Sequence, residues 1–347
     1  MGVKIGNFDL EKDILIVAEL SANHKQSLEL AKETIYAMKE AGADAVKLQT
    51  YTPDTITAPF DNEYFKIKGG TLWDGKTLYE LYREAYTPWE WHYELKELAE
   101  KLGLIFFSTP FDKSAVDFLE DLDIPAYKIA SFEITDIPLI EYVASKGKPV
   151  IISTGIATLA DIEEAINACK RVGNEQIILL KCTSAYPTPL EEANVSVIPK
   201  LKELFGVPVG LSDHTEGITV PVVATTLGAV LIEKHFILSK KIDSPDKEFS
   251  LTPEEFKEMV IAVRSAKKAL GDGVYKLSEE MKKGRVFGRS LFVVKDVKKG
   301  ELFTPENVRS IRPGYGLHPK YYNQIVGKKR ARKDIKAGTP LTWDLID

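Results

Sequence analysis

Eight short apolar runs, separated by amphipathic or polar stretches, are the feature that most constrains how this chain can fold. The runs are apolar along most of their length, which is typical of parallel strands buried on both faces. The expected strands cover residues 14–18, 45–48, 104–108, 126–130, 150–153, 177–181, 207–211 and 229–233. The stretches that predict helices cover 28–41, 89–102, 159–171 and 253–270. This α/β pattern predicts a (β/α)8 TIM barrel; the alternative, a doubly wound open sheet, is disfavoured because no Gly-rich dinucleotide motif is present.

The chain is longer than one barrel requires. It has 347 residues, whereas a barrel of this kind takes roughly 250. Segment 271–284 is polar and Gly-rich and predicts a linker, and 285–347 holds short turn-bounded segments that predict a small β-rich domain. Segments 297–302 and 335–341 are near-copies, which indicates hairpin turns or an internal pseudo-repeat. We therefore expect a barrel domain over 1–270, then the linker and a second domain.

Composition argues against several classes of protein. A net charge of -5 disfavours a nucleic-acid partner, which would require a basic patch. No run approaches the ~18 apolar residues of a membrane-spanning helix, and the first residues carry no apolar signal region. Cys169 and Cys182 form neither a metal-binding spacing nor a disulfide framework. We expect a cytoplasmic protein with no membrane partner.

The connection between the second and third expected strands is unusually long and aromatic. It includes 51–91, with Trp73, Trp89, Trp91 and several tyrosines. Long connections inside a compact domain usually cover a binding site or an interface.

Polar residues end or follow all eight expected strands. In a barrel the carboxyl ends of the strands meet at one rim, where active sites form. These residues are Glu19, Lys47, Gln49, Ser108, Thr109, Lys128, Ser131, Glu133, Ser153, Thr154, Lys181, Thr183, Ser184, Ser212, Asp213, His214, Glu233, Lys234 and His235. One such residue is ordinary helix capping, but a complete ring of them indicates a site.

Four lysines of this ring lie within or at the ends of otherwise apolar strands, where an unpaired charge is costly. They are Lys47, Lys128, Lys181 and Lys234. Converging ammonium groups together with Ser and Thr hydroxyls predict a site for a multiply charged anion such as phosphate. Ion pairs with Glu19, Glu133 or Glu233 are the structural alternative, and a Schiff-base lysine is a further one.

His214 and His235 follow the last two strands and predict an open divalent metal site. Two imidazoles, completed by water and substrate oxygens, suit Mn²⁺ or a similar ion better than Ca²⁺. Such a site polarises a carbonyl oxygen, and Glu19 and Glu133 are candidate acid/base groups. Together these groups indicate a carbonyl electrophile that meets a phosphorylated small molecule. The structural alternative is two histidines with local hydrogen bonds.

Eight motifs, in order, resemble those of the sialic acid (nonulosonic acid) synthases. They are Ala-Glu-Leu-Ser-Ala-Asn-His at 18–24, Val-Lys-Leu-Gln-Thr at 46–50, Phe-Ser-Thr-Pro-Phe at 107–111, Lys-Ile-Ala-Ser-Phe-Glu at 128–133, Ile-Ser-Thr-Gly at 152–155, Cys-Thr-Ser-Ala-Tyr-Pro at 182–187, Gly-Leu-Ser-Asp-His-Thr at 210–215 and Ile-Glu-Lys-His-Phe at 232–236. The resemblance extends over essentially the whole chain, because the second domain looks like the antifreeze-like (SAF) module that ends these enzymes.

Within the family, the details resemble the pseudaminic branch more than the N-acetylneuraminate branch. The aromatic insert at 69–92, Ser-Ala-Asn-His at 21–24, Ser-Phe-Glu-Ile-Thr-Asp at 131–136 and Ser184 carry this resemblance. Two departures from the family's pattern are Lys25-Gln26, where many members have Asn-Gly, and 243–246, which lacks a Gly before Pro-Asp.

The resemblance implies a transferase that condenses phosphoenolpyruvate with an N-acetylated amino sugar, 2,4-diacetamido-2,4,6-trideoxy-altrose in the pseudaminic branch, and releases phosphate by C–O cleavage. The residues implied to bind phosphoenolpyruvate are Lys47, Thr109, Lys128, Ser131, Ser153, Ser184 and Ser212. Those implied to contact the sugar are Gln49, Glu133, Tyr186, Asp246 and Arg312.

The resemblance also assigns catalytic roles and a partner. His214 and His235 would hold the metal, for which Mn²⁺ is expected and Mg²⁺ and Co²⁺ are the alternatives. Glu19 would be the base for the water that adds at carbon 2 of phosphoenolpyruvate. A domain-swapped homodimer is expected, in which the SAF module caps the partner's barrel and Arg312 reaches the partner's sugar.

Three other functions stay open at this point. N-acetylneuraminate or legionaminate synthesis would use the same chemistry on another acceptor. A non-catalytic glycan-binding protein would belong to a different class, although such a protein needs no metal site. A Schiff-base aldolase would need one of the strand lysines as its nucleophile.

Overall fold

The computed structural model describes residues 2–347, which form two compact units, the first ending at Gly271 and the second spanning Asp272–Asp347. The first unit is a closed parallel barrel with strand order β10-β3-β4-β5-β6-β7-β8-β9. Its strands are β3 (Leu15–Glu19), β4 (Ala45–Thr50), β5 (Ile105–Pro110), β6 (Tyr127–Ile129), β7 (Val150–Ser153), β8 (Ile177–Lys181), β9 (Val209–Asp213) and β10 (Leu231–His235). Because β10 pairs with both β9 and β3, the sheet closes, which confirms the TIM barrel and excludes the open sheet.

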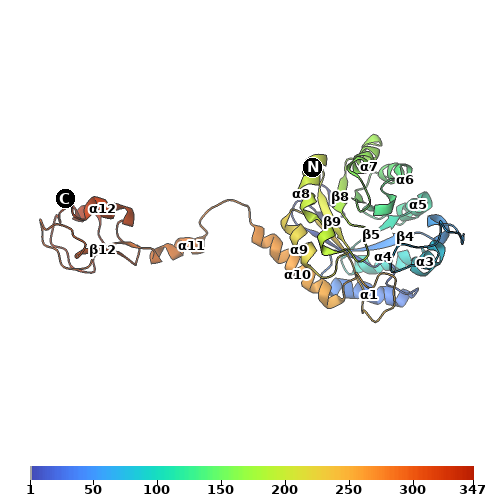
Figure 1. Cartoon of the computed structure of the whole chain (residues 1–347), viewed down its shortest axis with the longest axis horizontal. Helices are drawn as coiled ribbons and strands as arrows, with labels where there is room; N and C mark the ends of the chain where they lie inside the picture. The colour runs from blue at the N-terminus through green and yellow to red at the C-terminus, as the bar shows by residue number, and fades with distance from the viewer. Residues whose placement is uncertain (1) are drawn as a thin grey trace. The chain divides into compact units, whose positions relative to one another are not determined.

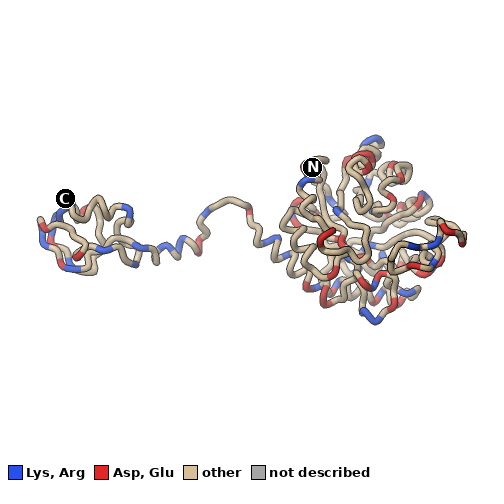
Figure 2. Tube along the Cα trace, viewed as in Figure 1, with Lys and Arg blue, Asp and Glu red and all other residues tan. Residues whose placement is uncertain are grey.

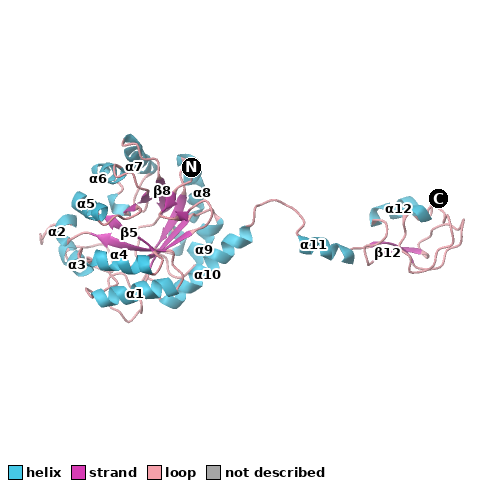
Figure 3. Cartoon of the chain, turned by 180° about the vertical axis from the view of Figure 1, so that it is seen from behind, coloured by secondary structure: helices cyan, strands magenta, loops and turns pink. Residues whose placement is uncertain are grey.

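Helices surround this barrel, and the strands run through its middle (Figures 1 and 3). The helices that follow the strands are α1 (Leu28–Glu40), α4 (Trp91–Lys101), α5 (Lys113–Asp121), α6 (Ile137–Ala144), α7 (Leu159–Arg171), α8 (Ile198–Phe205), α9 (Thr219–Thr226) and α10 (Pro253–Leu270). Thr158 caps α7 and Thr252 caps α10, each in a capping box that satisfies backbone donors of the first turn.

Several strands continue further than their apolar runs predict. β4 extends to Thr50, β5 to Pro110, β9 to Asp213 and β10 to His235. The strand pairing continues through these polar positions, for example between His235 and Glu19. Polar residues expected just after the strands therefore lie on regular, buried strand backbone, which holds them more firmly than a loop would.

The barrel interior has an apolar floor and a polar upper layer, because side chains along a strand alternate between two faces. The inner apolar cluster contains Leu15, Val17, Ala45, Phe107, Ile151, Ile178, Leu180 and Leu231. The hairpin of β1 (Lys4–Ile5) and β2 (Phe8–Asp9) packs against it through Ile5 and Phe8. Gly210 keeps the floor compact, since a Cβ there would lie 2.5 Å from the carbonyl oxygen of Leu231.

The long aromatic connection folds into α2 (Pro53–Ile56), α3 (Leu78–Ala85) and a short hairpin-like turn between them. Asp74 accepts hydrogen bonds from the backbone N–H groups of Gly69, Gly70 and Thr71, which holds the turn together. The indole of Trp73, at the tip of this turn, donates to the carbonyl of Pro245 at 3.1 Å.

The second unit is small and built around β11 (Ser290–Val293), β12 (Val308–Ile311) and α12 (Tyr322–Ile325). The near-copies 297–302 and 335–341 lie side by side, because Val297 and Ile335 exchange backbone hydrogen bonds. Their apolar residues share one core with Leu291 and Phe303.

Segment 271–284, the expected linker, ends in a helix, α11 (Glu279–Gly284). Ser278 caps this helix and accepts from the N–H of Met281. Its acidic residues occupy the first turn and its lysines the last, as the helix dipole favours.

Lys, Arg, Asp and Glu are mixed over both units rather than segregated by sign (Figure 2). Within residues 2–347, no helix has the length and apolarity needed to cross a membrane.

Candidate active site

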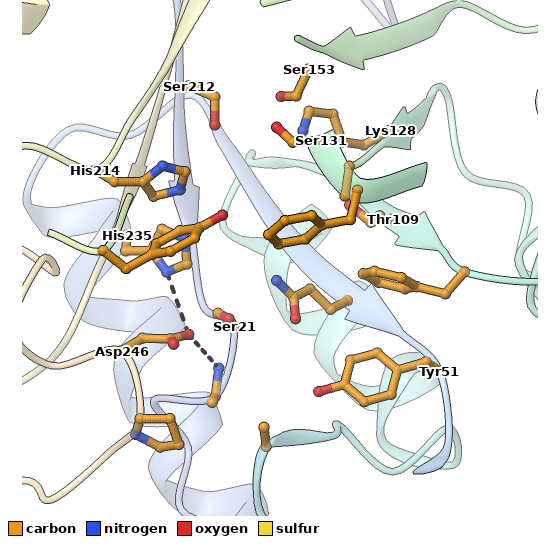
Figure 4. Close-up of a pocket in the computed structure, with 18 of the residues that line it drawn as sticks. Ser21, Tyr51, Thr109, Lys128, Ser131, Ser153, Ser212, His214, His235 and Asp246 are labelled. Carbon is orange, nitrogen blue, oxygen red and sulfur yellow. Dashed lines mark hydrogen bonds and ion pairs between the residues drawn. The ribbon is translucent and has the colours of Figure 1, made fainter. Parts of the chain in front are cut away.

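A pocket opens at the carboxyl end of the barrel, where the polar upper layer meets the loops that follow the strands (Figure 4). Its lining contains the predicted residues Lys47, Gln49, Thr109, Lys128, Ser131, Glu133, Ser153, Tyr186, Ser212, His214, His235 and Asp246. The structure therefore brings together most of the site residues predicted from the sequence, and they come from seven different strands and the loops that follow them.

One end of the pocket is cationic and rich in hydroxyls. Lys47 and Lys128 are almost completely buried. The Lys47 ammonium donates to the Thr109 hydroxyl at 3.2 Å and forms an ion pair with Glu19. The hydroxyl of Ser153 is buried without a hydrogen-bond partner in the described chain. An orphaned buried hydroxyl on the same side of the pocket as Lys128 (Figure 4) is suited to a ligand oxygen.

Ser131 and Gly155 form the adjacent part of this cationic end. Ser131 starts a 3-10 turn, η1 (Ser131–Glu133), directly after β6, and its hydroxyl accepts from the N–H of Gly155 at 3.1 Å. A Cβ on Gly155 would lie 2.6 Å from that hydroxyl and 2.1 Å from the hydroxyl of Ser184. The glycine is thus required for the two hydroxyls to approach this backbone.

Two carboxylates form ion pairs with the lysines of the cationic end: Glu19, outside the pocket lining, with Lys47, and Glu233, which lines the pocket, with Lys47 and Lys128. Glu233 lies 3.4 Å from the Lys47 ammonium and 3.7 Å from the Lys128 ammonium. Burial opposes its ionisation, but these two cations outweigh burial and lower the pKa of Glu233. Burial raises the pKa of Glu19 to about 7 against the opposing effect of Lys47. Glu19 can therefore exchange a proton at neutral pH, whereas Glu233 stays charged.

His214 and His235 lie on the opposite side from Lys128 and Ser153 (Figure 4), with ring centroids 5.3 Å apart. Nδ1 of His214 lies 3.3 Å from the carbonyl oxygen of Thr183. When Nδ1 carries the ring proton and donates a hydrogen bond to this carbonyl, Nε2 keeps a free lone pair. Burial first, and the charge of His214 second, hold the pKa of His235 well below its usual range, so its ring is neutral.

The imidazole pair has the features of an open metal site. Nδ1 of His235 is buried without a hydrogen-bond partner in the described chain and lies 3.6 Å from Asp246. Across residues 2–347 no cluster of three or more His, Cys, Asp or Glu side chains surrounds a common point. Two imidazoles with few protein ligands around them fit a divalent ion whose other positions are taken by water or substrate.

Carboxyl groups and aromatic rings line the remaining part. Burial raises the pKa of Glu133 to about 7, and one of its oxygens is buried without a partner in the described chain. Burial also raises the pKa of Asp246, which accepts from the N–H of Ala22. The Tyr186 ring lies 4.6 Å from the His214 ring and 5.7 Å from the Trp73 ring.

The expectation that all four strand lysines converge was wrong. Lys234 points away from the pocket and forms a buried ion pair with Asp213 at 2.6 Å. Lys181 donates to the carbonyl of Cys182 and to the Thr183 hydroxyl. Both lysines occupy outward positions of their strands, because inward and outward side chains alternate.

Three of the residues with a predicted catalytic or substrate-binding role lie outside the pocket lining. Glu19 lies beneath it against Lys47, and Ser184 lies behind Gly155 with its hydroxyl unpartnered in the described chain. Arg312 belongs to the second unit, and the pocket is lined by residues of the first.

Several pocket residues were not predicted from the sequence. They are Ser21, Tyr51, Tyr82, Phe111, Cys182 and Phe249. Cys182 could have been found, since it lies two positions after Leu180 and so shares its inward face. No sequence signal identifies Phe249, which contacts both imidazole rings from a loop after β10.

Comparisons with known proteins agree with this geometry. The NeuB family model matches residues 34–275, and the SAF domain model matches 288–347. The chain is 53% identical to a pseudaminic acid synthase of Campylobacter jejuni, over 98% of each chain. It is 54% identical to one of Helicobacter pylori, over 96% of this chain and 97% of that one. The crystal structure of a spore coat polysaccharide biosynthesis protein of Bacillus subtilis has a TM-score of 0.69 and 34% identity, covering 100% of this chain and 99% of that one.

Proposed function

This chain belongs to the NeuB family, and from that membership we propose that it condenses phosphoenolpyruvate with 2,4-diacetamido-2,4,6-trideoxy-altrose, as a pseudaminic acid synthase. The identity to two such synthases over nearly the whole chain supports this activity. The observation that carries the proposal is a pocket in which a lysine- and hydroxyl-lined end faces the imidazoles of His214 and His235. One end suits a phosphate and the other a carbonyl oxygen.

Phosphoenolpyruvate binds at the cationic end. Lys47 and Lys128 supply positive charge, and the hydroxyls of Thr109, Ser131 and Ser153 supply neutral donors. Ser212 donates to Glu233 at 3.3 Å and lies beside them. Because the lysines and the free hydroxyl are already in place and buried, the anion meets donors that need no rearrangement. The Ser184 hydroxyl packs against Gly155 at this end of the pocket, since a Cβ on Gly155 would lie 2.1 Å from it.

His214 and His235 would hold a divalent ion, with Mn²⁺ proposed and Mg²⁺ or Co²⁺ as alternatives. When bound, such an ion acts as a Lewis acid toward a carbonyl oxygen. The orphaned Nδ1 of His235 and its neutral ring support this assignment. Asp246, 3.6 Å from that nitrogen, holds the loop after β10 to the N–H of Ala22.

Two carboxyl groups of the chain, those of Glu133 and Glu19, can exchange protons with the reacting groups. Carbon 3 of phosphoenolpyruvate attacks the aldehyde carbon of the open-chain sugar, which leaves an oxocarbenium at carbon 2 and negative charge on the former aldehyde oxygen. Glu133, with a pKa of about 7, can hold the proton that this oxygen takes up. Glu19, also with a pKa of about 7, can accept the proton of the water that adds at carbon 2. The tetrahedral product then expels phosphate by C–O cleavage and becomes a ketone.

The remaining sugar contacts come from Gln49, Tyr186 and Asp246, which also line the pocket. Arg312 is proposed to reach the sugar of a partner protomer within a domain-swapped homodimer, as the family resemblance implies. A cytoplasmic location is also proposed, supported by two free buried thiols, Cys169 and Cys182, which a reducing compartment preserves.

The direct test is phosphate release from phosphoenolpyruvate with the altrose acceptor and Mn²⁺. Wild-type protein should release phosphate only when the acceptor is present, and His214→Ala should lose roughly 100-fold or more of kcat, because the carbonyl loses its electrophilic partner. Unchanged activity in this variant would remove the metal assignment. Equal or faster turnover of the N-acetylneuraminate or legionaminate acceptor would move the chain to another branch of the family.

A further inference from the structure

One wall of the pocket is made of aliphatic and aromatic side chains. We call it the apolar wall, and it consists of Tyr51, Ile56, Leu81, Tyr82, Ala85 and Phe111. Tyr51 follows β4, Phe111 follows β5, and the others belong to α2 and α3. The wall therefore comes almost entirely from the aromatic connection, and the reaction chemistry derived above uses none of its residues.

The apolar wall is a built surface rather than a loose loop. The Tyr51 ring makes edge-to-face contacts with the rings of Tyr82, at 5.6 Å, and Phe111, at 5.1 Å. Tyr51 is 2% exposed and Leu81 is 7% exposed. Leu81 and Ala85 are one helical turn apart, so α3 presents them on the same face. The backbone of Tyr51 is held as well, because its carbonyl accepts from the Trp89 indole at 3.1 Å.

The barrel places this wall across from the imidazoles. In the closed strand order, β5 and β9 are four strands apart in either direction. Phe111, after β5, is thus opposite His214, after β9. In Figure 4, Tyr51 lies at the far end of the pocket from Ser153, with the imidazoles on the other side. An acceptor whose aldehyde carbon is at the imidazoles points its last carbon away from them, toward the apolar wall.

We propose that the apolar wall is a specificity-determining subsite for the terminal methyl group of the acceptor, and that Ile56 and Leu81 make the enzyme prefer a 6-deoxy sugar to its 6-hydroxy counterpart. This inference rests on the proposed function. A methyl group gains by leaving water at such a surface. Beside Ile56 and Leu81 a hydroxyl loses its water partners, and these aliphatic side chains offer no replacement; the polar side-chain atoms of the wall are the phenol hydroxyls of Tyr51 and Tyr82. A hydrophobic pocket rejects a hydroxyl-bearing analogue by a factor on the order of 10–100.

The test compares kcat/KM for two acceptors that differ only at carbon 6, in the wild type and in two matched pairs of variants. Ile56→Val and Ile56→Thr have nearly the same shape, as do Leu81→Met and Leu81→Gln, but one member of each pair adds polar atoms. The wild type should prefer the 6-deoxy acceptor by about 10–100-fold. Ile56→Val and Leu81→Met should keep that ratio within about threefold. Ile56→Thr and Leu81→Gln should reduce the ratio by about tenfold or more. Thermal melting shows that each variant is folded.

Two results would overturn the inference: equal kcat/KM for both acceptors in the wild type, or equal ratios within both matched pairs. In either case phosphate is still released, so the proposed function survives. Failure of the proposed function has a different signature, namely no phosphate release with either acceptor at saturating phosphoenolpyruvate and Mn²⁺. That result removes the inference together with its premise.

Discussion

At the scale of single residues, environment sets what each carboxyl group can do. Glu19, Glu133 and Glu233 all lie at the same rim, yet the pKa values of Glu19 and Glu133 rise to about 7 and that of Glu233 falls. Burial raises all three, and two nearby ammonium groups reverse the effect only at Glu233. One residue type therefore supplies two proton-exchanging groups and one permanent countercharge.

These pKa values predict a bell-shaped pH profile centred near 7. Glu19 must be deprotonated to accept a proton, so kcat/KM should rise as pH increases toward its pKa of about 7. Glu133 must be protonated to donate, so kcat/KM should fall as pH increases beyond its pKa of about 7. Initial-rate measurements between about pH 5 and 9 should show Glu19→Gln losing roughly 100-fold or more of kcat/KM together with the rising limb.

In the same assay, Glu133→Gln should instead lack the falling limb of the pH profile. If the Gln variant of Glu19 kept the rising limb, another group would be the base. Glu19→Asp serves as the control, because it retains a carboxyl group at this position and should keep a rising limb.

At the scale of elements, the two-residue period of a strand decides which lysines reach the substrate. Lys47 and Lys128 occupy inward positions and enter the pocket, whereas Lys181 and Lys234 occupy outward positions and form local contacts. Burial alone does not separate them, since Lys234 is as deeply buried as Lys128.

The alternation makes Lys128→Met and Lys181→Met a matched pair. Loss of the Lys128 ammonium removes a charge-assisted contact, so KM for phosphoenolpyruvate should rise roughly 10–100-fold. The Lys181 variant should stay within about threefold of the wild type, because its ammonium contacts only the chain's own Cys182 and Thr183 in the described structure. Steady-state kinetics with varied phosphoenolpyruvate measures both, and a similar rise in the two variants would contradict the inward assignment.

At the scale of the whole molecule, the chain is two compact units that match two family models. The pocket residues come from the first unit, whereas the proposed sugar-binding Arg312 belongs to the second. A domain-swapped homodimer would give the second unit a role in catalysis on the partner's barrel.

Mixing two inactive variants tests that arrangement. His214→Ala should be inactive through its own barrel, and Arg312→Ala should lose activity because no arginine reaches the partner's sugar. After subunit exchange, half of the dimers carry both variants and each has one intact site, so about a quarter of wild-type activity should return. Exchange is verified with two affinity tags, and verified exchange without recovered activity would contradict the swap.

The barrel could be predicted from the amino-acid sequence, because eight buried strands are visible as apolar runs and can pair in few ways. The position of the site at the carboxyl ends of the strands, and most residues of the pocket, could also be predicted. Strand-end residues such as Lys47, Ser153 and His235 must meet at that rim in any such barrel. The motifs indicated the family and the chemistry.

Which strand-end residues face one another, and which side chains cover them, depends on the three-dimensional packing of the chain and could not be predicted from the sequence. Inward and outward positions depend on where each strand enters the barrel, which is why Lys181 and Lys234 were wrongly grouped with Lys128. The apolar wall and Phe249 come from connections whose path depends on long-range packing, such as the contact of Tyr51 with Phe111. The pKa values near 7 likewise come from burial and from neighbours distant in the sequence, which no local pattern encodes.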